Sequence, residues 1–277
     1  MHDILKEEVG IQHFTYCPSM YHAKKRDWDP TDKTYVQLAA DEDEHFNLIT
    51  DEIQTRLKPL KNVDDQRSVI VFFKDVDELN RFRDSSYFNR YREMAGVLTE
   101  ITAMTPESRD SIIKAATRQG MVTLATKAYG RGTDFKIFDD RMEDCGGMHV
   151  LQTFFSCEIS EEVQIQGRCA RQGHKGSYSM VLKVGALVTD FNLREADVKA
   201  WPSNQLYGKL CQCRTSKALK EVEALRARAH ECKKEHDQTI AAISAGPEAM
   251  AKFVRTKNNG QNVSFEDEDE DEDEDLD

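Results

Sequence analysis

The sequence predicts an α/β domain in which a parallel sheet carries helices on both faces, followed by a helical extension and a disordered acidic tail. The first observation is a series of short runs of β-forming residues, with helical segments between them. These predicted strands are 68–73, 97–101, 121–125, 148–155 and 177–184. Strands separated by single helices indicate right-handed crossovers and a parallel sheet. The strand pattern then stops after Val188, and residues 203–245 are almost wholly helical in character.

Local signals place the starts of the helices between these strands. Asp75 precedes a helical segment and Glu78 follows three residues later, which is the spacing of a capping box. Thr105 and Pro106 are the residue types preferred at the N-cap and at the first helical position. Ser160 is predicted to cap the helix that follows the fourth strand.

Four regions are predicted along the chain. They are a lead-in segment (1–65), the α/β domain (66–188), a helical extension (189–247) and a disordered acidic tail (248–277). The lead-in contains a predicted helix over 38–57, because its apolar residues recur on one stripe. The extension carries an apolar seam that is predicted to pack on the domain or on a partner. The seam consists of Val222, Leu225, Ala229, Cys232, His236, Ile240 and Ile243.

The net charge of −12 belongs mainly to the tail. Residues 266–277 contain eleven acids and no base, so removing these eleven negative charges leaves −1 for the rest of the chain. A run of like charges repels itself and buries no apolar surface, which predicts disorder. It indicates a solubilising tail more often than a contact for a basic partner.

The composition predicts a soluble, cytoplasmic protein. No apolar run approaches the ~18–20 residues of a membrane span, and the start of the chain has no apolar signal-peptide core. The seven scattered cysteines predict free thiols in a reducing compartment. Cys211, Cys213, Cys232 and His236 offer metal-ligand chemistry, but two of them fall on the helix seam, so no metal site is predicted.

Two segments carry residues suited to binding. The first, 125–134, follows the third predicted strand, and ligands in parallel α/β sheets bind outside the carboxyl ends of strands. Gly130 and Gly132 allow the backbone to approach a ligand closely. Thr133 and Asp134 add a hydroxyl and a carboxylate for a ribose, a metal-bound water or a facing loop. By itself, the pattern favours a tight turn.

The second segment is 164–173. Gln164, Arg168 and Arg171 are predicted to share one helix face, because they stand at i, i+4 and i+7. Two guanidinium groups on one face favour an anion, most plausibly phosphate. A solvated basic face has the same spacing, so the spacing leaves both interpretations open.

These segments resemble the SecA family. Residues 123–134, Thr-Leu-Ala-Thr-Lys-Ala-Tyr-Gly-Arg-Gly-Thr-Asp, are similar to its helicase motif V. The Gly-Gly-Met-His-Val of 146–150 is similar to the family's Gly-Gly-Leu-His-Val, and 164–173 is similar to motif VI, Gln-x-x-Gly-Arg-x-x-Arg-Gln-Gly. Lys-Gly-Ser-Tyr at 175–178 continues motif VI, and 68–73 stands where motif IV stands. The resemblance covers about Gln66 to Val184 well, and the segment before it more loosely.

The resemblance implies a RecA-like fold, the second of two motor domains, with ATP and Mg²⁺ in the cleft between them. It implies that Arg171 is the arginine finger that reaches the γ-phosphate and that Arg168 is its companion. The implied nucleotide-binding residues are Gly132, Thr133, Asp134, Gln164 and His174. At position 174 the family commonly has Asp; here a histidine keeps a hydrogen-bonding group and loses the fixed negative charge.

The other half of such a motor is not in the sequence. No Gly-x-x-x-x-Gly-Lys-Ser/Thr segment occurs, and no apolar strand ends in an Asp-Glu-Ala-Asp-like box. We therefore expect ATP hydrolysis only when a first motor domain is supplied, in cis or in trans. The abrupt start favours a fragment or truncated gene product over a second chain.

Three functions follow from the sequence. The first is the motor half of a SecA-like ATPase that moves polypeptide, with membranes contacted only peripherally. The second is a nucleic-acid helicase domain. The nearly neutral charge of the chain without its acidic tail makes nucleic acid an unlikely partner. The third is a non-catalytic interaction module that uses the long helix as its contact.

Overall fold

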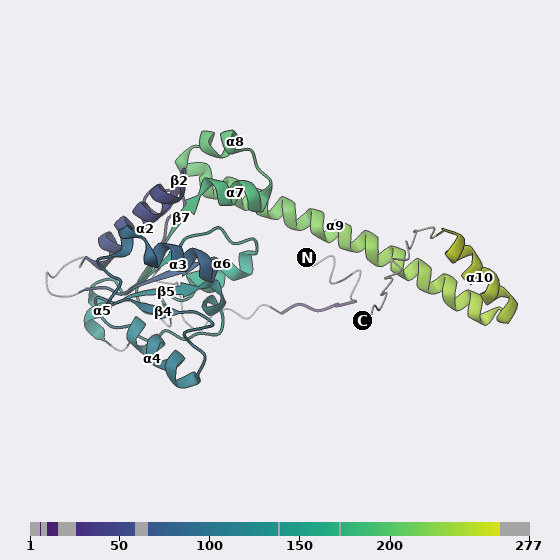
Figure 1. Ribbon diagram of the computed structural model, residues 1–277, viewed down its shortest axis with the longest axis horizontal. Helices are drawn as coiled ribbons and strands as arrows, with labels where there is room; N and C mark the ends of the chain where they lie inside the picture. Colours follow the sequence, from purple (N-terminus) through teal and green to yellow (C-terminus); the bar gives the residue numbers. More distant parts are fainter. Residues whose placement is uncertain are drawn as a thin grey trace, which may run out of the picture. The chain divides into compact units, whose positions relative to one another are not determined.

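The computed structural model describes residue 6 and residues 10–15, 26–58, 66–137, 139–171 and 173–260. The chain divides into two compact units, Met1–Thr215 and Ser216–Asp277. The sheet lies in the first unit (Figure 1). In the described residues, no helix is both long enough and apolar enough to cross a membrane.

A parallel sheet forms the centre of the first unit. In the described part of the chain it has seven strands in the order β1-β7-β6-β3-β5-β4, with β2 also paired to β7, and every pairing is parallel. The strands are β1 (Arg26–Asp27), β2 (Val36–Ala39), β3 (Val69–Phe73), β4 (Gly96–Leu98), β5 (Val122–Thr126), β6 (Met148–Gln152) and β7 (Gly176–Lys183). The prediction of an α/β fold, in which a parallel sheet carries helices on both faces, is confirmed.

Helices cover both faces of the sheet. Alternate residues of β3 show the division, because Val71 packs with Phe46 and Phe82 on one side while Phe72 packs with the cluster on the other. The first face carries α2 (Glu42–Leu57), α3 (Val76–Asp84) and the 3₁₀ turn η1 (Ser86–Phe88). The second face carries α4 (Pro106–Ala116), α5 (Asp140–Asp144), α6 (Ile159–Gln166), α7 (Val184–Phe191), α8 (Glu195–Ala200) and the start of α9 (Ser203–Ser244).

Two of the predicted helix caps are present and one is wrong. The Asp75 carboxylate accepts the Glu78 N–H at 2.8 Å, and the Thr105 hydroxyl accepts the Ser108 N–H at 3.2 Å. Ser160 does not cap α6, because this helix begins at Ile159 and its N-cap residue, Glu158, makes no side-chain cap bond. Ser160 instead donates its hydroxyl to the Glu158 carboxylate at 3.1 Å.

The predicted lead-in segment is part of the sheet domain. β1 and β2 both pair with β7, and α2 packs into the core of the first face, so the domain extends before residue 66. The helix predicted over 38–57 starts at Glu42, because Asp41 caps it and Leu38 lies in a strand. A strand of four residues next to a helix is too short to show a period in the sequence.

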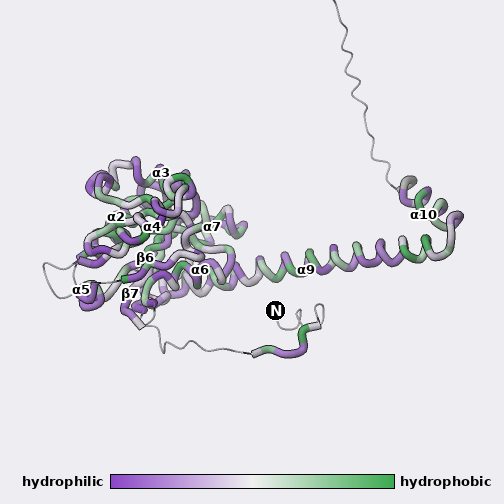
Figure 2. The backbone as a smooth tube through the Cα atoms, turned by 90° about the horizontal axis from the view of Figure 1, so that it is seen from below, coloured by the Kyte–Doolittle hydropathy of each residue, from purple (hydrophilic) through white to green (hydrophobic). Residues whose placement is uncertain are grey.

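The second unit contains the remainder of α9 and α10 (Pro247–Gly260). The prediction of disorder from residue 248 is wrong for 248–260, which are helical; residues 266–277, the acidic run, lie outside the described part. In α9, hydrophobic and hydrophilic residues alternate (Figure 2). The predicted seam is uncovered in the described structure, since Leu225, Ile240 and Ile243 are 64%, 47% and 56% exposed.

Candidate functional site

The loop after β5 is built around close contact with α6. The strand ends at Thr126 and leads into a 3₁₀ turn, η2 (Lys127–Gly130). A Cβ atom on Gly130 would lie 2.5 Å from Cγ1 of Ile165, so only glycine lets the turn approach α6 this closely. The next glycine, Gly132, has φ +68°, in the left-handed region that favours glycine. The two glycines therefore set the path of the 131–134 segment toward α6.

The two arginines of the segment that resembles motif VI, Arg168 and Arg171, follow α6 and do not lie on it. The helix ends at Gln166 with Gly167 as its C-cap, so the predicted helix face of Gln164, Arg168 and Arg171 does not exist. Glycine is a helix-terminating residue, and the backbone beyond it is irregular, with Ala170 at φ 51°. The prediction that these three residues share a helix face was wrong, because the helix ends before Arg168.

The structure nevertheless brings both arginines to the loop after β5. Arg168 folds back so that its Nε donates to the backbone oxygen of Gln164 at 3.0 Å, and its Nη1 donates to the backbone oxygen of Thr133. Arg171 donates from Nη1 to the carboxylate of Asp134, which Lys136 also approaches at 3.4 Å. The predicted residues of motifs V and VI are therefore in direct contact.

The two arginines differ in their surroundings. Burial lowers the pKa of the Arg168 guanidinium from its usual value, and the neighbouring charge of Arg171 lowers it further. Arg171 is 36% exposed and its partner Asp134 is 44% exposed. A pair this exposed contributes only ~0.2–1 kcal/mol, so an incoming anion can compete with Asp134 for Arg171. Arg168, in contrast, has a fixed backbone partner on each side.

A cavity of about 200 Å³ opens beside the arginines. Its lining residues are Phe135, Lys136, Ile137, Arg168, Ala170, Arg171 and His174. A larger cavity of about 660 Å³ lies where Gly132, Thr133 and Asp134 face α4. The predicted site residues thus border two adjoining cavities, with the exception of Gln164, which enters the site through its backbone oxygen.

His174 is held by a residue that the sequence analysis missed. Its Nδ1 lies 3.4 Å from Oε2 of Glu143, and the same carboxylate accepts the Lys175 N–H at 2.8–2.9 Å. Gly147 brings these segments together, because a Cβ atom there would lie 1.9 Å from the Lys175 backbone oxygen. The Gly-Gly pair of 146–147 was the signal in the sequence, since such close approach requires glycine.

Tyr129 and Lys136 also have identifiable roles. The Tyr129 hydroxyl donates to the Thr99 backbone oxygen at 3.0 Å, which ties η2 to the segment after β4. Burial raises the pKa of Tyr129, so the hydroxyl stays protonated and remains a donor. Lys136 is the second cation on Asp134. Both residues therefore support the loop that carries the predicted site.

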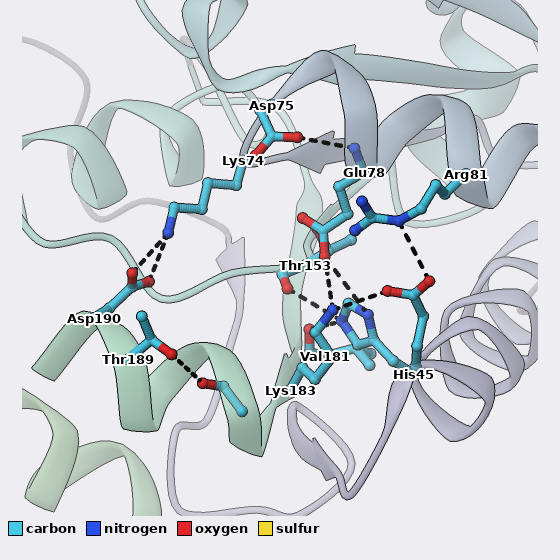
Figure 3. Close-up of polar contacts among 12 residues, drawn as sticks. His45, Lys74, Asp75, Glu78, Arg81, Thr153, Val181, Lys183, Thr189 and Asp190 are labelled. Atoms are coloured by element: carbon cyan, nitrogen blue, oxygen red, sulfur yellow. Dashed lines mark hydrogen bonds and ion pairs between the residues drawn. The ribbon is translucent and has the colours of Figure 1, made fainter. Parts of the chain in front are cut away.

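A separate polar cluster ties helices to the carboxyl edge of the sheet (Figure 3). His45 of α2 is fully buried, and its Nε2 lies 3.2 Å from the Thr153 backbone oxygen and 3.0 Å from that of Val181. Burial lowers the pKa of His45 to about 4, so the ring is neutral and Nε2 carries the proton that both carbonyls accept. Nearby, Lys74 donates to Asp190 of α7 at 2.7 Å and 2.9 Å.

The arrangement fits an anion better than a metal ion. Two guanidinium groups converge beside a small cavity, and guanidinium forks match the oxygens of a phosphate. Among the residues that the structure describes, no group of three or more His, Cys, Asp or Glu side chains could hold a metal ion. The site can therefore contribute positive charge to a phosphate.

Comparison with known proteins finds relatives among protein translocase subunits. SecA 2 of Rhodopirellula baltica is 31% identical over 141 residues, which are 50% of this chain and 20% of the relative. SecA 2 of Nitrosospira multiformis is 38% identical over 84 residues, or 30% of this chain and 12% of the relative. SecA of Chlamydia abortus is 33% identical over 139 residues, or 46% and 14%. The chain thus spans a fifth or less of the length of these relatives.

Solved structures with a similar fold include domain 2 of the DEAD-box helicase Mss116p bound to an RNA duplex, with TM-score 0.41 and 19% identity, covering 73% of this chain and 78% of that one. A second is the E. coli DEAD-box protein SrmB bound to regulator of ribonuclease activity A, with TM-score 0.39 and 21% identity, covering 55% and 78%. No protein-family model matches the chain.

The parallel sheet and its flanking helices define the class of the protein as an α/β domain with a parallel sheet between two layers of helices. Over about half of its length, the chain is similar to the protein translocase subunit SecA.

Proposed function

We propose that this chain supplies one side of the ATP-binding cleft of a SecA-like motor. In this proposal Arg171 is the arginine finger and Arg168 its companion, and Gly132, Thr133 and Asp134 form the facing loop. The observation that carries it is the contact between the two motifs: Arg168 donates to the Thr133 backbone oxygen and Arg171 to the Asp134 carboxylate. Segments 37 residues apart are thus joined at one anion-sized cavity.

The proposed role of Arg171 is to stabilise the charge that develops on the γ-phosphate. Such an arginine accelerates hydrolysis by ~10³–10⁵ in related nucleotide hydrolases. In the structure Arg171 is paired with Asp134, and this exposed pair is weak enough to open when phosphate arrives. Arg168 remains anchored to two backbone oxygens and keeps the geometry of the segment. Gln164 and His174 complete the proposed nucleotide contacts.

The remaining parts of the cleft are proposed to come from a first motor domain, in cis or in trans. That domain would bring the phosphate loop and most ligands of Mg²⁺, since the sequence has neither a phosphate-loop motif nor an acidic box. Bound ATP and Mg²⁺ would provide the phosphoryl group and neutralise its charge. The similarity to SecA supports polypeptide as the substrate whose movement is coupled to turnover. A cytoplasmic location with only peripheral membrane contact goes with this proposal.

The test is ATP turnover by the purified chain, with and without a separately produced SecA-type first motor domain. We expect turnover only in the mixture, and its loss in Arg171→Ala. Arg194→Ala is the matched control, because Arg194 is an exposed arginine paired with Asp197 outside the site. No turnover in either sample would favour the interaction-module function. Tight, salt-sensitive binding of RNA or DNA would favour the helicase function instead.

A further inference from the structure

A buried ion pair joins α6 to the start of α9. Arg214 of α9 is 5% exposed and Glu162 of α6 is 1% exposed. Arg214 Nη1 donates to Oε2 of Glu162 at 2.5 Å. The other carboxylate oxygen accepts the Tyr207 hydroxyl at 2.5 Å and the side-chain amide of Gln166 at 2.9 Å. Three side chains from two helices therefore converge on one carboxylate.

The surroundings of Arg214 make this pair rigid. Nη1 also donates to the Ser156 backbone oxygen at 3.3 Å, and the guanidinium carbon lies 4.5 Å from the centre of the Phe155 ring. Burial lowers the pKa of Arg214, but the hydrogen bond and charge of Glu162 outweigh it and the pKa rises, so the group is permanently charged. A buried charge whose partner is removed is strongly unfavourable. The first turns of α9 are therefore locked to α6.

Glu162 lies in α6 just before the segment that resembles motif VI, residues 164–173. Glu162 precedes Gln164 by two residues, and the Gln164 backbone oxygen accepts Nε of Arg168. Arg168 in turn donates to Thr133 on the opposite loop. Because α6 has only eight residues and its last turn leads directly into Arg168, a displacement of α6 moves this arginine. The contacts form an unbroken path from Arg214 through α6 to the loop after β5.

We propose that Glu162 and Arg214 are positioning residues for the motif VI arginines, so that the start of α9 sets how Arg168 and Arg171 are presented to a phosphate. The ligand in this statement rests on the proposed function; the positioning does not. Neither residue touches the phosphate-facing cavity, whose lining contains Arg168 and Arg171. A contact path alone is not coupling, so the coupling itself must be measured.

The test is hydrogen–deuterium exchange of the full chain in Arg214→Met, read by mass spectrometry. The useful amides are hydrogen-bonded ones near the site: Gly167 to Val163, Arg168 to Ile165, His174 to Arg171 and Lys175 to Glu143. We expect exchange in 164–175 and 131–136 to rise roughly tenfold or more, because this unit opens locally, while β3 and β5 stay unchanged. Arg194→Met is the control. Unchanged exchange in 164–175, or an equal rise in every element, overturns the proposal.

A second variant keeps the test decisive if Arg214→Met does not fold. Arg214→Lys retains the charge but loses the fork, so we expect an intermediate rise confined to the same segments. An exchange pattern in Arg214→Lys equal to that of the unchanged chain would overturn the proposal. In the assembled motor, Arg214→Met should lower kcat while KM for ATP changes little, and Arg214→Lys should restore part of kcat.

The two proposals fail in different ways. If the unchanged chain shows no turnover with a first motor domain, yet Arg214→Met still raises exchange in 164–175, the positioning stands and the proposed function falls. If turnover requires Arg171 but Arg214→Met alters neither exchange nor kcat, the proposed function stands and the positioning role is wrong.

Discussion

Arg171 donates to the carboxylate of Asp134 and so joins the segment after α6 to the loop after β5. The pair is exposed on both sides. The ion pair therefore contributes little to the stability of the fold, and an anion can replace Asp134 as the partner of Arg171. This relationship leads to the first prediction.

Asp134→Asn should strengthen binding of inorganic phosphate by the chain. The ion pair with Asp134 contributes ~0.2–1 kcal/mol, and in the variant phosphate no longer has to break it. This corresponds to roughly a 1.5- to 5-fold gain in phosphate affinity at low salt. A ³¹P NMR titration measures it. Asp197→Asn, which changes an equally exposed carboxylate on Arg194, is the control. Unchanged or weaker phosphate binding would show that Asp134 does not compete for Arg171.

Arg168→Lys should reduce turnover in the assembled motor without preventing nucleotide binding. Lysine keeps the charge but cannot donate at once to the Gln164 and Thr133 oxygens, as Arg168 does from Nε and Nη1. We expect kcat to fall about 10- to 100-fold, because a displacement of a catalytic group by about 1 Å can slow a reaction by up to about 100-fold. Steady-state kinetics with a first motor domain measures it. An unaltered kcat would mean that the two backbone contacts do not matter for catalysis.

Gly147→Ala should destabilise the fold and loosen the segment that carries His174. The added Cβ would lie 1.9 Å from the Lys175 oxygen, a backbone atom, and Gly147 has φ +73°. Strain of these two kinds costs about 1–3 kcal/mol each. Urea unfolding measures the loss.

The control for Gly147→Ala is Gly208→Ala in α9. Apart from the neighbouring residues and the backbone of α9 itself, no atom of the described residues lies within 4 Å of a Cβ built there, and alanine is the better helix former. This variant should gain about 0.5–1 kcal/mol. Equal effects of the two alanines would contradict the close approach of 147 and 175.

Stability should fall as the pH drops from about 6.5 to about 4, partly because of His45. The folded pKa of His45 is about 4 owing to burial, whereas the unfolded histidine takes up its proton near pH 6.5. In this window the unfolded state binds more protons, so acidification favours unfolding by up to about 1.4 kcal/mol per pH unit. Burial also lowers the pKa of His149, which adds to the slope, while the raised pKa of Glu78 opposes it.

His45→Gln isolates the contribution of His45. The glutamine amide can still donate to the Thr153 and Val181 oxygens but does not titrate. Urea unfolding at several pH values should give a curve of free energy against pH that is less steep between pH 6.5 and 4. Parallel curves for the two proteins would mean that His45 does not titrate differently on folding.

Much of the fold could be predicted because its signals are local. Strands such as β3 are continuous apolar runs, as expected for strands buried on both faces. Asp75 and Thr105 cap helices through bonds that span three residues. Where a signal was shorter, as in β2, or where a glycine ended a helix before a periodic residue, as at Gly167, the prediction was wrong.

The sequence by itself determined the alternation of strands and helices from β3 to β7 and the residues of the two segments at the site, because those follow from local periodicity, capping and glycine. Only the tertiary structure decided that Arg171 meets Asp134, 37 residues away, and that Arg214 meets Glu162, 52 residues away. Contacts at such separations depend on how the parallel strands and their crossovers pack, and no period along the chain encodes them. The sequence therefore supplies the residue types of the site, and its geometry arises from the contacts of α6 with β6, with the turn after β5 and with α9.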